Sequence, residues 1–458
     1  MKNPLPNNSI STIILAAGQG TRMKSNVTKV LHQLGGKFLL QHVIDAVLPL
    51  TESIRVVVGH NSESVKNVIN NNINWVFQKN QLGTGHAVKE EIPSIADNSI
   101  CLILYGDVPL IQTNTLSTLI KKAESTGFSI LTVIQKNPSG YGRIIRNSSQ
   151  AIQSIIEHDD ATPEELEIDE INSGIMAVRG LLLKKYLNEL KPNNSQGELY
   201  LTDIVEKAVK DDVNITSFTC ENSSEVMGIN TKNNLAEAER VYQQKLAQSF
   251  MTNGLTLKDP SRFDCRGNLI FGSDCIIDVN VIFEGDNQLG NNVVIASNCI
   301  IKNAKIGDHA YINQNSTIED STIGSHTSIG PFARIRPETR VGDHAKIGNF
   351  VEVKKSSIGN NSKVSHLSYI GDSLVGKDVN IGAGVITCNY DGVNKHQTVI
   401  DDGVFVGSNS QLIAPVTIGK NATIGAGSTI TQDVPSEKLT LSRNKQATIS
   451  KWKRPQKK

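Results

Sequence analysis

The stretch "IGSHTSIGPFARIRPETRVGDHAKIG", residues 323–348, places an aliphatic side chain at every sixth position. These positions are Ile323, Ile329, Ile335, Val341 and Ile347, and a glycine directly follows four of them. A six-residue repeat is typical of a parallel β-helix, in which stacked coils bury a continuous core. The aliphatic residue fills the interior, and the small residue beside it permits the tight turn at each corner. This stretch therefore predicts a β-helix.

The repeat extends in both directions from this stretch. It runs from Ile306 to Ile358 in steps of six, apart from two steps of five, and it resumes from Ile400 to Ile430. Three repeats make one triangular coil of about 18 residues. Flat faces and open ends of such a prism favour self-association, and a trimer suits its triangular section.

The repeat is interrupted once, in the sequence "GAGVITCNYDGVNKHQTVI" at residues 382–400. A regular β-helix face cannot easily form a pocket, whereas a loop that leaves the coil can fold over a neighbouring surface. The interruption is therefore a candidate site of chemistry in this half. A tolerated insertion with no role is the alternative.

The first half of the chain has a different pattern. Continuous aliphatic runs such as STIILAAG, SIRVVVG and SICLILYGD alternate with segments of helical periodicity. This alternation predicts an α/β domain with a mostly parallel sheet covered on both faces. We expect three parts: an α/β domain at residues 1–232, a linker helix at 233–253, and a β-helix domain with a basic tail at 254–458.

Composition narrows the function classes. The 458 residues include 46 basic and 45 acidic side chains, a net charge of +1 that gives no support to a nucleic-acid or membrane role. No apolar run approaches the roughly 20 residues that a membrane-spanning helix needs. The six cysteines form no CxxC pair, and the N-terminus lacks the apolar segment of a signal peptide. We expect reduced thiols and a cytoplasmic protein.

A glycine-rich turn, "LAAGQGTRMKS" at residues 15–25, follows the first predicted strand and is expected to open a helix. Backbone N–H groups in such a turn bind phosphate, and Arg22 and Lys29 supply positive charge. The turn does not match the P-loop or GxGxxG patterns. An ordinary strand-to-helix turn is the alternative.

Two further segments accompany this turn. "QKNQLGTGHA" at residues 78–87 carries amides that could read a nucleobase edge, and "YGDVPL" at 105–110 ends an apolar strand with Asp107. Ligands of open α/β sheets bind at the carboxyl ends of strands, where a lone carboxylate suits Mg²⁺. A helix cap or turn residue is the alternative interpretation of Asp107.

In the second half, His366 and Tyr369 lie about one coil before the interruption, and Arg336 and Lys354 lie on preceding coils. Acyl transfer to an amine needs a base that works near neutral pH, and histidine is suited to that task. His366 is the candidate base, and a solvated surface histidine is the alternative.

Together these motifs resemble the sugar-1-phosphate nucleotidyltransferases. Within them, the chain is most similar to the bacterial bifunctional N-acetylglucosamine-1-phosphate uridylyltransferase/glucosamine-1-phosphate N-acetyltransferase family, and the resemblance covers both halves in order. It implies a Rossmann-like sheet followed by a left-handed β-helix, a homotrimer, Mg²⁺ as cofactor, and UTP and acetyl-CoA as co-substrates.

The resemblance also implies roles for individual residues. Arg22 and Lys29 would assist uridylyl transfer, and Asp107 and Asn230 would bind Mg²⁺. UTP and the nucleotide-sugar product would be held by Leu15, Ala16, Ala17, Gly18, Lys29, Gln78, Gly83, Thr84, Tyr105, Gly106, Asp107, Gly142, Glu157, Asn172 and Asn230. The acceptor sugar phosphate would be held by Arg336, Lys354, Tyr369, Asn380 and Lys395. Acetyl-CoA would be held by Ala383, Asn389, Tyr390, Ser408, Ala426 and Arg443, with Asn389 also orienting His366.

Two other functions remain open from the sequence. The β-helix could be a regulatory or oligomerising module attached to a nucleotidyltransferase, or a non-enzymatic surface-binding solenoid. The second alternative predicts a sustained ladder of one residue type along a face, and the sequence contains none.

Overall fold

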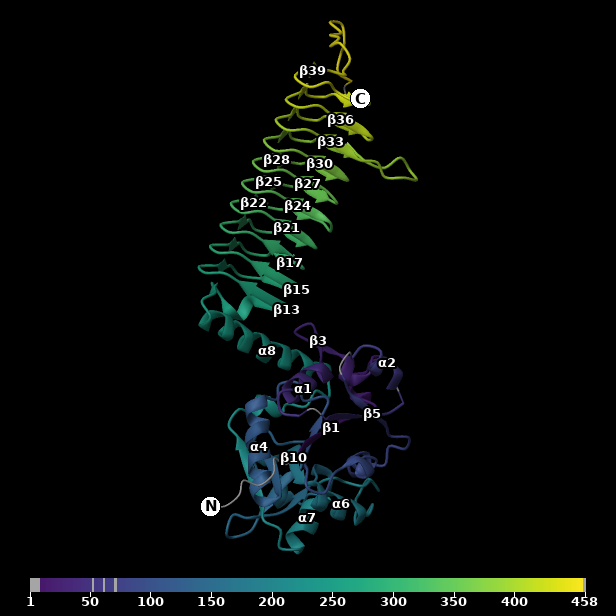
Figure 1. Cartoon of the computed structure of the whole chain (residues 1–458), viewed down its shortest axis with the longest axis vertical. Coiled ribbons are helices and arrows are strands. Elements are labelled where there is room, and N and C mark those ends of the chain that lie inside the picture. Colours follow the sequence, from purple (N-terminus) through teal and green to yellow (C-terminus); the bar gives the residue numbers. More distant parts are fainter. Residues whose placement is uncertain (1–8, 52, 61, 70–71, 456–458) are drawn as a thin grey trace. The chain divides into compact units, whose positions relative to one another are not determined.

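The computed structural model describes residues 9–51, 53–60, 62–69 and 72–455, and the chain divides into two units, Met1–Tyr242 and Gln243–Lys458 (Figure 1). The first unit is an α/β sandwich and the second is a parallel β-helix. The fold class predicted from the sequence is confirmed for both halves.

The central sheet of the first unit has the strand order β11-β7-β10-β6-β1-β4-β5. Neighbouring strands pair in parallel except β10, which runs antiparallel to both β6 and β7. The sheet is therefore mixed, with one reversed strand near its middle. Its strands are β1 (Ile10–Ala16), β4 (Ser53–Val58), β5 (Asn74–Phe77), β6 (Ile100–Tyr105), β7 (Phe128–Ile134), β10 (Glu170–Arg179) and β11 (Ile215–Cys220), with the side strands β8 (Arg143–Arg146) and β9 (Ile152–Ile156) and the separate hairpin β2 (Gln33–Leu34) and β3 (Lys37–Phe38).

Successive side chains along β1 point to opposite faces of the sheet, which explains why helices cover both faces. Ile14 packs in a core that includes helices α1 and α4, whereas Ile13 packs in a core that includes α3, α6 and α7. The helices are α1 (Leu39–Val47), α2 (Ser62–Lys66), α3 (Thr84–Lys89), α4 (Thr113–Thr126), α5 (Pro163–Leu166), α6 (Gly180–Asn188), α7 (Asp203–Lys210) and α8 (Lys232–Thr252). Shorter 3₁₀ turns are η1 (Thr21–Met23), η2 (Lys29–Leu31), η3 (Ile92–Ser94), η4 (His158–Asp160), η5 (Ser223–Val226) and η6 (Pro260–Arg262).

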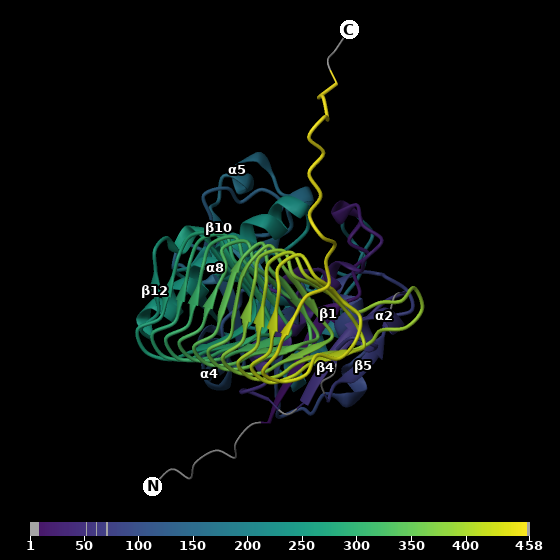
Figure 2. The same ribbon diagram turned by 90° about the horizontal axis from the view of Figure 1, so that it is seen from above.

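The second unit is built from stacked coils whose strands pair in parallel (Figure 2). Ile329 pairs with Ile347, 18 positions later, and Ile347 pairs with Val364, 17 positions later. The aliphatic repeat positions point inward, and Ile329, Ile335 and Ile347 are all 0% exposed. The six-residue repeat thus becomes one strand per face and three faces per coil.

We name the faces in chain order. The first face is an eleven-stranded sheet of β12 (Thr256–Leu257), β14 (Ile276–Ile277), β16 (Val294–Ile295), β19 (Tyr311–Ile312), β22 (Ser328–Ile329), β25 (Lys346–Asn349), β28 (Lys363–His366), β31 (Asn380–Ile381), β34 (Phe405–Val406), β37 (Thr423–Ile424) and β39 (Leu439–Thr440). The long strands β13 (Phe263–Phe271) and β15 (Val281–Leu289) begin the other two faces.

The second face continues with β17 (Ile300–Lys302), β20 (Thr317–Glu319), β23 (Arg334–Ile335), β26 (Glu352–Lys354), β29 (Tyr369–Gly371), β32 (Ile386–Cys388), β35 (Gln411–Ile413) and β38 (Thr429–Ile430). The third face continues with β18 (Lys305–Ile306), β21 (Ser321–Ile323), β24 (Thr339–Val341), β27 (Ser357–Ile358), β30 (Ser373–Val375), β33 (Thr398–Ile400) and β36 (Val416–Ile418).

The interruption of the repeat leaves the coil between β32 and β33, and both ribbon views show it as a protruding loop (Figures 1 and 2). We call residues 389–397 the excursion. An isolated bridge between Tyr390 and Lys395 closes it, and the Asp391 carboxylate accepts hydrogen bonds from the backbone N–H groups of Val393 and Asn394. The excursion is thus a folded hairpin rather than an open loop.

Within the described part of the chain, no helix combines the length and the apolar character that crossing a bilayer requires.

The stacking of aliphatic positions makes the β-helix core sensitive to truncation. Ile347 is 0% exposed, so Ile347→Ala should lower the free energy of unfolding by about 2–5 kcal/mol, because the cavity cannot close within a rigid stack. Ile270→Ala is the matched control, since Ile270 in the same unit is 67% exposed, and should cost under about 0.5 kcal/mol. Denaturant unfolding followed by circular dichroism measures both values, and equal losses would contradict the assignment of Ile347 to the core.

Candidate active sites

The glycine-rich turn begins where β1 ends, at the carboxyl edge of the first unit's sheet. The helix expected to follow it is absent: the structure has the three-residue 3₁₀ turn η1 there, and the next α-helix begins at Leu39. The reason is local, because Gly20 and Lys24 on either side of η1 both have left-handed backbone angles that stop a helix. Any phosphate bound here would meet loop N–H groups rather than a helix N-terminus.

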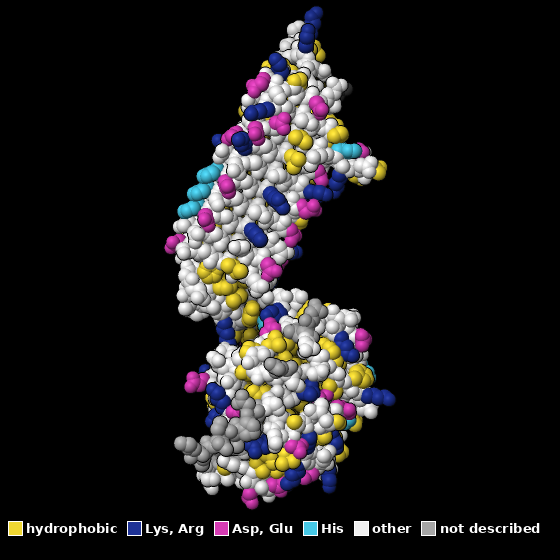
Figure 3. Space-filling model, viewed as in Figure 1, with side chains coloured by type: hydrophobic (Ala, Val, Ile, Leu, Met, Phe, Trp, Pro, Cys, Tyr) yellow, Lys and Arg dark blue, Asp and Glu magenta, His cyan; other side chains and the backbone are white. Residues whose placement is uncertain are grey.

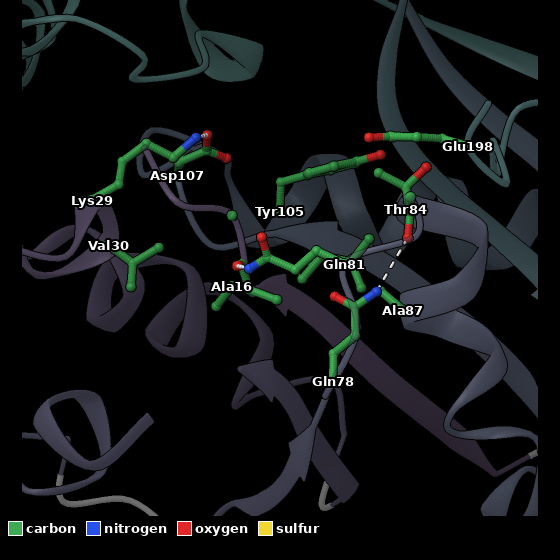
Figure 4. Close-up of a pocket in the computed structure, with 14 residues that line it drawn as sticks. Ala16, Lys29, Val30, Gln78, Gln81, Thr84, Ala87, Tyr105, Asp107 and Glu198 are labelled. Atoms are coloured by element: carbon green, nitrogen blue, oxygen red, sulfur yellow. Dashed lines mark hydrogen bonds and ion pairs between the residues drawn. The ribbon is translucent and has the colours of Figure 1, made fainter. Parts of the chain in front are cut away.

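A pocket of about 280 Å³ opens beside this turn (Figure 4). Ten of the residues assigned to nucleotide binding line it: Leu15, Ala16, Ala17, Gly18, Lys29, Gln78, Gly83, Thr84, Tyr105 and Asp107. The four lining residues that the sequence did not single out are Val30, Gln81, Ala87 and Glu198. The structure therefore brings three separate sequence motifs to one cavity.

Amide side chains hold two walls of this pocket together. The Gln78 Nε2 amide donates to the Gly83 carbonyl at 3.3 Å and lies 3.1 Å from Nδ1 of His86. The Gln81 amide donates to the carbonyl of Ala17, which ties the second motif to the glycine-rich turn. These bonds fix the rim against which a nucleobase or ribose could lie.

Positive charge and oxygen ligands meet at one side of the pocket, where Figure 4 shows Lys29 and Asp107 in contact. The Lys29 ammonium forms an ion pair with the Asp107 carboxylate and also donates to Asn230 Oδ1 at 3.2 Å. The Arg22 guanidinium donates to the same Asn230 oxygen at 3.1 Å. The two assigned Mg²⁺ ligands and the two assigned cations therefore form one cluster, although Arg22 and Asn230 do not line the pocket.

The remaining assigned residues are linked to one another, and Glu157 among them acts on the half-buried Tyr105. Gly142 lies against Glu157, and its carbonyl accepts from the Asn172 N–H at 2.8 Å. The Gly106 N–H donates to the carbonyl of Leu15 at 2.9 Å. Burial, followed by the charge of Glu157, raises the pKa of Tyr105, so its hydroxyl stays protonated.

Glu157 is held by a residue that the sequence gave no reason to select. The Thr202 hydroxyl donates to Glu157 Oε1 at 2.9 Å. Burial is the main cause that raises the pKa of Glu157. Thr202 and Glu198 lie in or beside an irregular segment with no periodicity, so no sequence pattern marked them. Gln81, in contrast, lies within a motif already quoted for its amides.

In the second unit, the imidazole of His366 is exposed at the end of β28. Its Nδ1 lies 2.7 Å from Oδ1 of Asn349, the residue paired with it on the neighbouring coil. Among the described residues of one chain, no hydrogen bond joins His366 to the excursion. Asn389, expected from the resemblance to orient His366, instead donates to the buried carboxylate of Asp372.

The residues assigned to acetyl-CoA extend from His366 along one column of the β-helix. Backbone bonds link each coil to the next: Gly384 N–H to His366 O, Asn409 N–H to Ala383 O, and Gly427 N–H to Ser408 O. At the end of the column, the Arg443 guanidinium donates to the Ala426 carbonyl at 3.0 Å. We call His366, Ala383, Ser408 and Ala426 the small-residue column. Strands lie about 4.8 Å apart, so its three steps span roughly 14 Å.

The cations assigned to the sugar phosphate gather on the second face. The Arg336 N–H donates to Val353 O, which sets Arg336 one coil before Lys354, and Lys354 pairs with Gly371. The Tyr369 hydroxyl lies over Gly371, where an added Cβ would be 2.4 Å from it. Lys354 is the main cause that lowers the pKa of Lys395, so the excursion brings its ammonium beside that of Lys354. We call Arg336, Lys354, Tyr369 and Lys395 the cation cluster.

Two assigned residues lie apart from these groups. Asn380 is on the first face, paired with Lys363 and Phe405, away from the cation cluster on the second face. Tyr390 is 60% exposed on the excursion, where its hydroxyl donates to the carbonyl of Gly392. His366 ends a first-face strand, whereas Lys354 and Gly371 end second-face strands. Within one chain, the width of the second face separates the candidate base from Lys354, whereas Tyr369 begins that face three residues after His366.

Comparison with known proteins gives matches to both units. Residues 12–161 match the MobA-like NTP transferase domain family, residues 397–432 match the bacterial transferase hexapeptide family, and residues 317–409 match the GMPPB C-terminal domain family.

Whole-length relatives cover nearly the entire chain. It is 57% identical over 451 residues to the "Bifunctional protein GlmU" of Ruthia magnifica subsp. Calyptogena magnifica, covering 98% of this chain and 100% of that protein. It is 57% identical to the protein of the same name from Vesicomyosocius okutanii subsp. Calyptogena okutanii (strain HA), covering 96% of this chain and 98% of the relative. Identity to that of Marinobacter nauticus (strain ATCC 700491 / DSM 11845 / VT8) is 50%, over 98% and 99% of the two chains. The chain therefore belongs to the GlmU family of bifunctional proteins.

Proposed function

We propose that the β-helix unit acetylates glucosamine-1-phosphate with acetyl-CoA, and that the α/β unit then joins the product to UTP, giving UDP-N-acetylglucosamine and pyrophosphate. The chain is a bifunctional uridylyltransferase and acetyltransferase. The observation that carries the proposal is the pairing of two different sites. One gathers cations and oxygen ligands beside a pocket, and the other places an exposed imidazole at the end of a column of small residues.

In the α/β unit, an oxygen of the sugar phosphate attacks the α-phosphorus of UTP. The new P–O bond forms as the bond to the β-phosphate breaks, and pyrophosphate leaves. The attacking group is already an anion, so the reaction needs alignment and charge neutralisation rather than a base. Lys29 and Arg22 supply the neutralising charge, and the loop N–H groups after β1 hold the phosphates. Tyr105, Gly142, Glu157 and Asn172 surround the uridine and the sugar.

The donor atoms beside the pocket suit Mg²⁺. Asp107 and Asn230 offer a carboxylate and an amide oxygen, which are hard ligands that Lys29 already brings together. The described residues contain no cluster of three or more His, Cys, Asp and Glu side chains that could hold a metal alone. This agrees with a Mg²⁺ ion that takes its other ligands from substrate phosphates and water. When bound, the ion neutralises charge on the phosphates.

In the β-helix unit, the amine of glucosamine-1-phosphate attacks the thioester carbonyl of acetyl-CoA. His366 removes the proton from the amine as the C–N bond forms, the C–S bond breaks, and the coenzyme leaves as a thiol after taking up a proton. The small-residue column leaves an open track of roughly 14 Å for the extended arm of the coenzyme. Arg443, at the end of this track, binds its phosphate groups.

The cation cluster binds the phosphate of the acceptor sugar. Arg336 is held in place by an ion pair with Glu352 at 2.7 Å. Lys354 lowers the pKa of Lys395 more than the nearby Asp372 carboxylate raises it, so the two ammonium groups repel each other. Two adjacent ammonium groups favour a bound anion, because it removes their mutual repulsion.

A complete acetyltransferase site needs two chains, because His366 and the cations Arg336 and Lys354 are on opposite edges of the second face. We propose a homotrimer in which His366 of one chain meets the cation cluster of the next. An apolar strip beside His366 supports contact with another copy: Phe332, Phe350 and Leu367 follow one another on successive coils at the corner where other coils carry Asn or Gly. They are 49%, 55% and 62% exposed, which favours burial by a partner.

Two alternative functions are less well supported. A purely regulatory β-helix needs neither a base nor a cluster of cations, yet both are present. Figure 3 shows histidine side chains in a row along one edge of the β-helix, and the rings of His309, His326 and His344 stack in such a row. This row covers only three coils, which is too short for a ladder that binds an extended surface.

We also propose a cytoplasmic location, where both co-substrates are made. All six cysteines are free thiols in the structure, and burial raises the pKa of Cys101 to about 11. Such thiols are poor nucleophiles and suit a reducing compartment.

Asp107→Ala should separate the two activities. Loss of the Asp107 carboxylate removes a proposed ligand of Mg²⁺ and the ion-pair partner that positions Lys29, so UTP-dependent release of pyrophosphate should fall at least ~100-fold. Release of free thiol from acetyl-CoA should be unchanged. Asp97→Ala is the matched control, since Asp97 pairs with Lys184 on the surface of the same unit. Loss of both activities in a folded Asp107→Ala protein would overturn the two-site proposal.

His366→Ala should have the reverse effect. Without the base, free-thiol release from acetyl-CoA should fall at least ~100-fold, while pyrophosphate release with N-acetylglucosamine-1-phosphate is kept. His344→Ala removes an equally exposed imidazole from the same unit and should leave both rates unchanged. A His366→Ala enzyme that acetylates at the wild-type rate would exclude His366 as the base.

Mixing two inactive variants tests whether the site is shared. His366→Ala and Lys354→Ala chains, co-expressed with different tags, should form trimers in which some interfaces contain both native residues. If each interface pairs one chain's His366 with the next chain's Lys354, random assembly restores roughly one quarter of the wild-type acetyltransferase activity. Light scattering should report three chains per particle. A mixed trimer with no activity would show that each chain forms its own site.

A further inference from the structure

Asn349 and His366 form a side-chain pair that no sequence motif predicted. Oδ1 of Asn349 lies 2.7 Å from Nδ1 of His366, and the two residues pair across β25 and β28 in the parallel register. Asn349 is half-buried, whereas His366 is exposed. The contact therefore fixes one side of the imidazole against the β-helix and leaves the other side facing outward.

Gly348 allows the two strands that carry this pair to lie close together. A Cβ at Gly348 would lie 1.9 Å from the carbonyl oxygen of Ser365, so only glycine allows the two strands to approach this closely just before the pair. The His366 carbonyl is held as well, since it accepts from the Ser368 hydroxyl at 2.8 Å and from the Gly384 N–H at 3.3 Å. Both residues of the pair are thus held by backbone that cannot easily shift.

We propose that Asn349 is a positioning residue that selects the reactive tautomer of His366. The amide oxygen of Asn349 can only accept a hydrogen bond, so Nδ1 must carry the proton. Nε2 then keeps its lone pair and faces outward, as a base requires. This inference rests on the proposed role of His366 as the base of acetyl transfer.

A neutral partner suits this task better than a carboxylate. A carboxylate beside the imidazole stabilises its protonated form and removes the free base at neutral pH, whereas an amide orients the ring without adding charge. The charged and titratable groups on the adjoining strands are Lys346 on β25, Lys363 on β28, Glu352 and Lys354 on β26, and Tyr369 on β29. Glu352 forms an ion pair with Arg336, and none of the five groups has a hydrogen bond to His366 among the described residues.

Asn349→Asp is the most informative variant. Aspartate accepts the same hydrogen bond and keeps the tautomer, but its charge favours the imidazolium. The acidic limb of the kcat/KM profile for acetyl transfer should therefore move up by roughly one pH unit, with kcat near the wild-type value above that limb. Free-thiol release from acetyl-CoA, measured from about pH 5.5 to about pH 9, gives the profile. The amine substrate titrates identically in every variant, so differences report the enzyme.

Asn349→Ala provides the second arm. Without an acceptor the ring can rotate and exchange tautomers, so kcat should fall about 10- to 100-fold, with little change in KM and no shift of the acidic limb. Asn315→Asp is the control for added charge, because residue 315 lies at the same corner three coils before Leu367. That separation of roughly 14 Å exceeds the screening length at physiological salt.

The outcomes distinguish this inference from the proposed function. If His366→Ala keeps acetyltransferase activity, the base itself is wrongly assigned. If His366→Ala is inactive but Asn349→Asp leaves the pH profile unmoved, or Asn349→Ala keeps the wild-type kcat, the positioning role is wrong. A merely structural role for Asn349 predicts that Asp and Ala lower activity alike, without any shift of the acidic limb.

Discussion

The backbone ladder between successive coils is the constraint on which the second unit depends. Most coils hydrogen-bond to the next at an offset of 17 or 18 residues, and across the excursion the offset is 25, so each paired residue stands directly over its partner. Strands of only two or three residues would be unstable alone, and they persist because both neighbours pair with them and their aliphatic side chains share one core. Residues that pair on successive coils therefore lie in columns, and the proposed functional residues of this unit follow these columns.

The first unit brings its proposed functional residues together in a different way. Its site residues come from β1, β6 and the loops between strands, and they converge because parallel strands end at one edge of the sheet. Arg22 and Lys29 can thus both donate to the same oxygen, Oδ1 of the distant Asn230. The β-helix offers no such convergence point, so its functional groups lie in rows: an imidazole below small residues on one edge, and cations along another. The excursion adds a second route, since it carries Lys395 back over the coil to Lys354.

Much of this arrangement could be predicted from the sequence, because the repeat period and the aliphatic runs report burial directly. Ten of the fourteen pocket-lining residues of the first unit were predicted through motifs that lie at strand ends, where local pattern and tertiary position coincide. The prediction of a helix after the glycine-rich turn was wrong, because the left-handed backbone angles at Gly20 and Lys24 prevent a helix there. Glu198, Thr202 and Asn349 were missed because each acts through a contact distant in sequence, with no periodicity to mark it. Asn349 becomes visible only when residue spacing is translated into columns.

The corner residues beside His366 differ from those of the other coils. Corner residues of the β-helix adopt left-handed backbone angles, and Asn280, Asn298, Asn315 and Asn409 suit that conformation. Phe332, Phe350 and Leu367 adopt it too, at a cost of about 1 kcal/mol each, while exposing apolar surface. Neither feature helps a single chain, and both occur only on the coils that carry the pair Asn349–His366 and the coil before it. An apolar residue with an unfavourable backbone angle and an exposed side chain needs a contact that compensates for both costs, and the homotrimer proposed above supplies such a contact from a neighbouring copy of the chain.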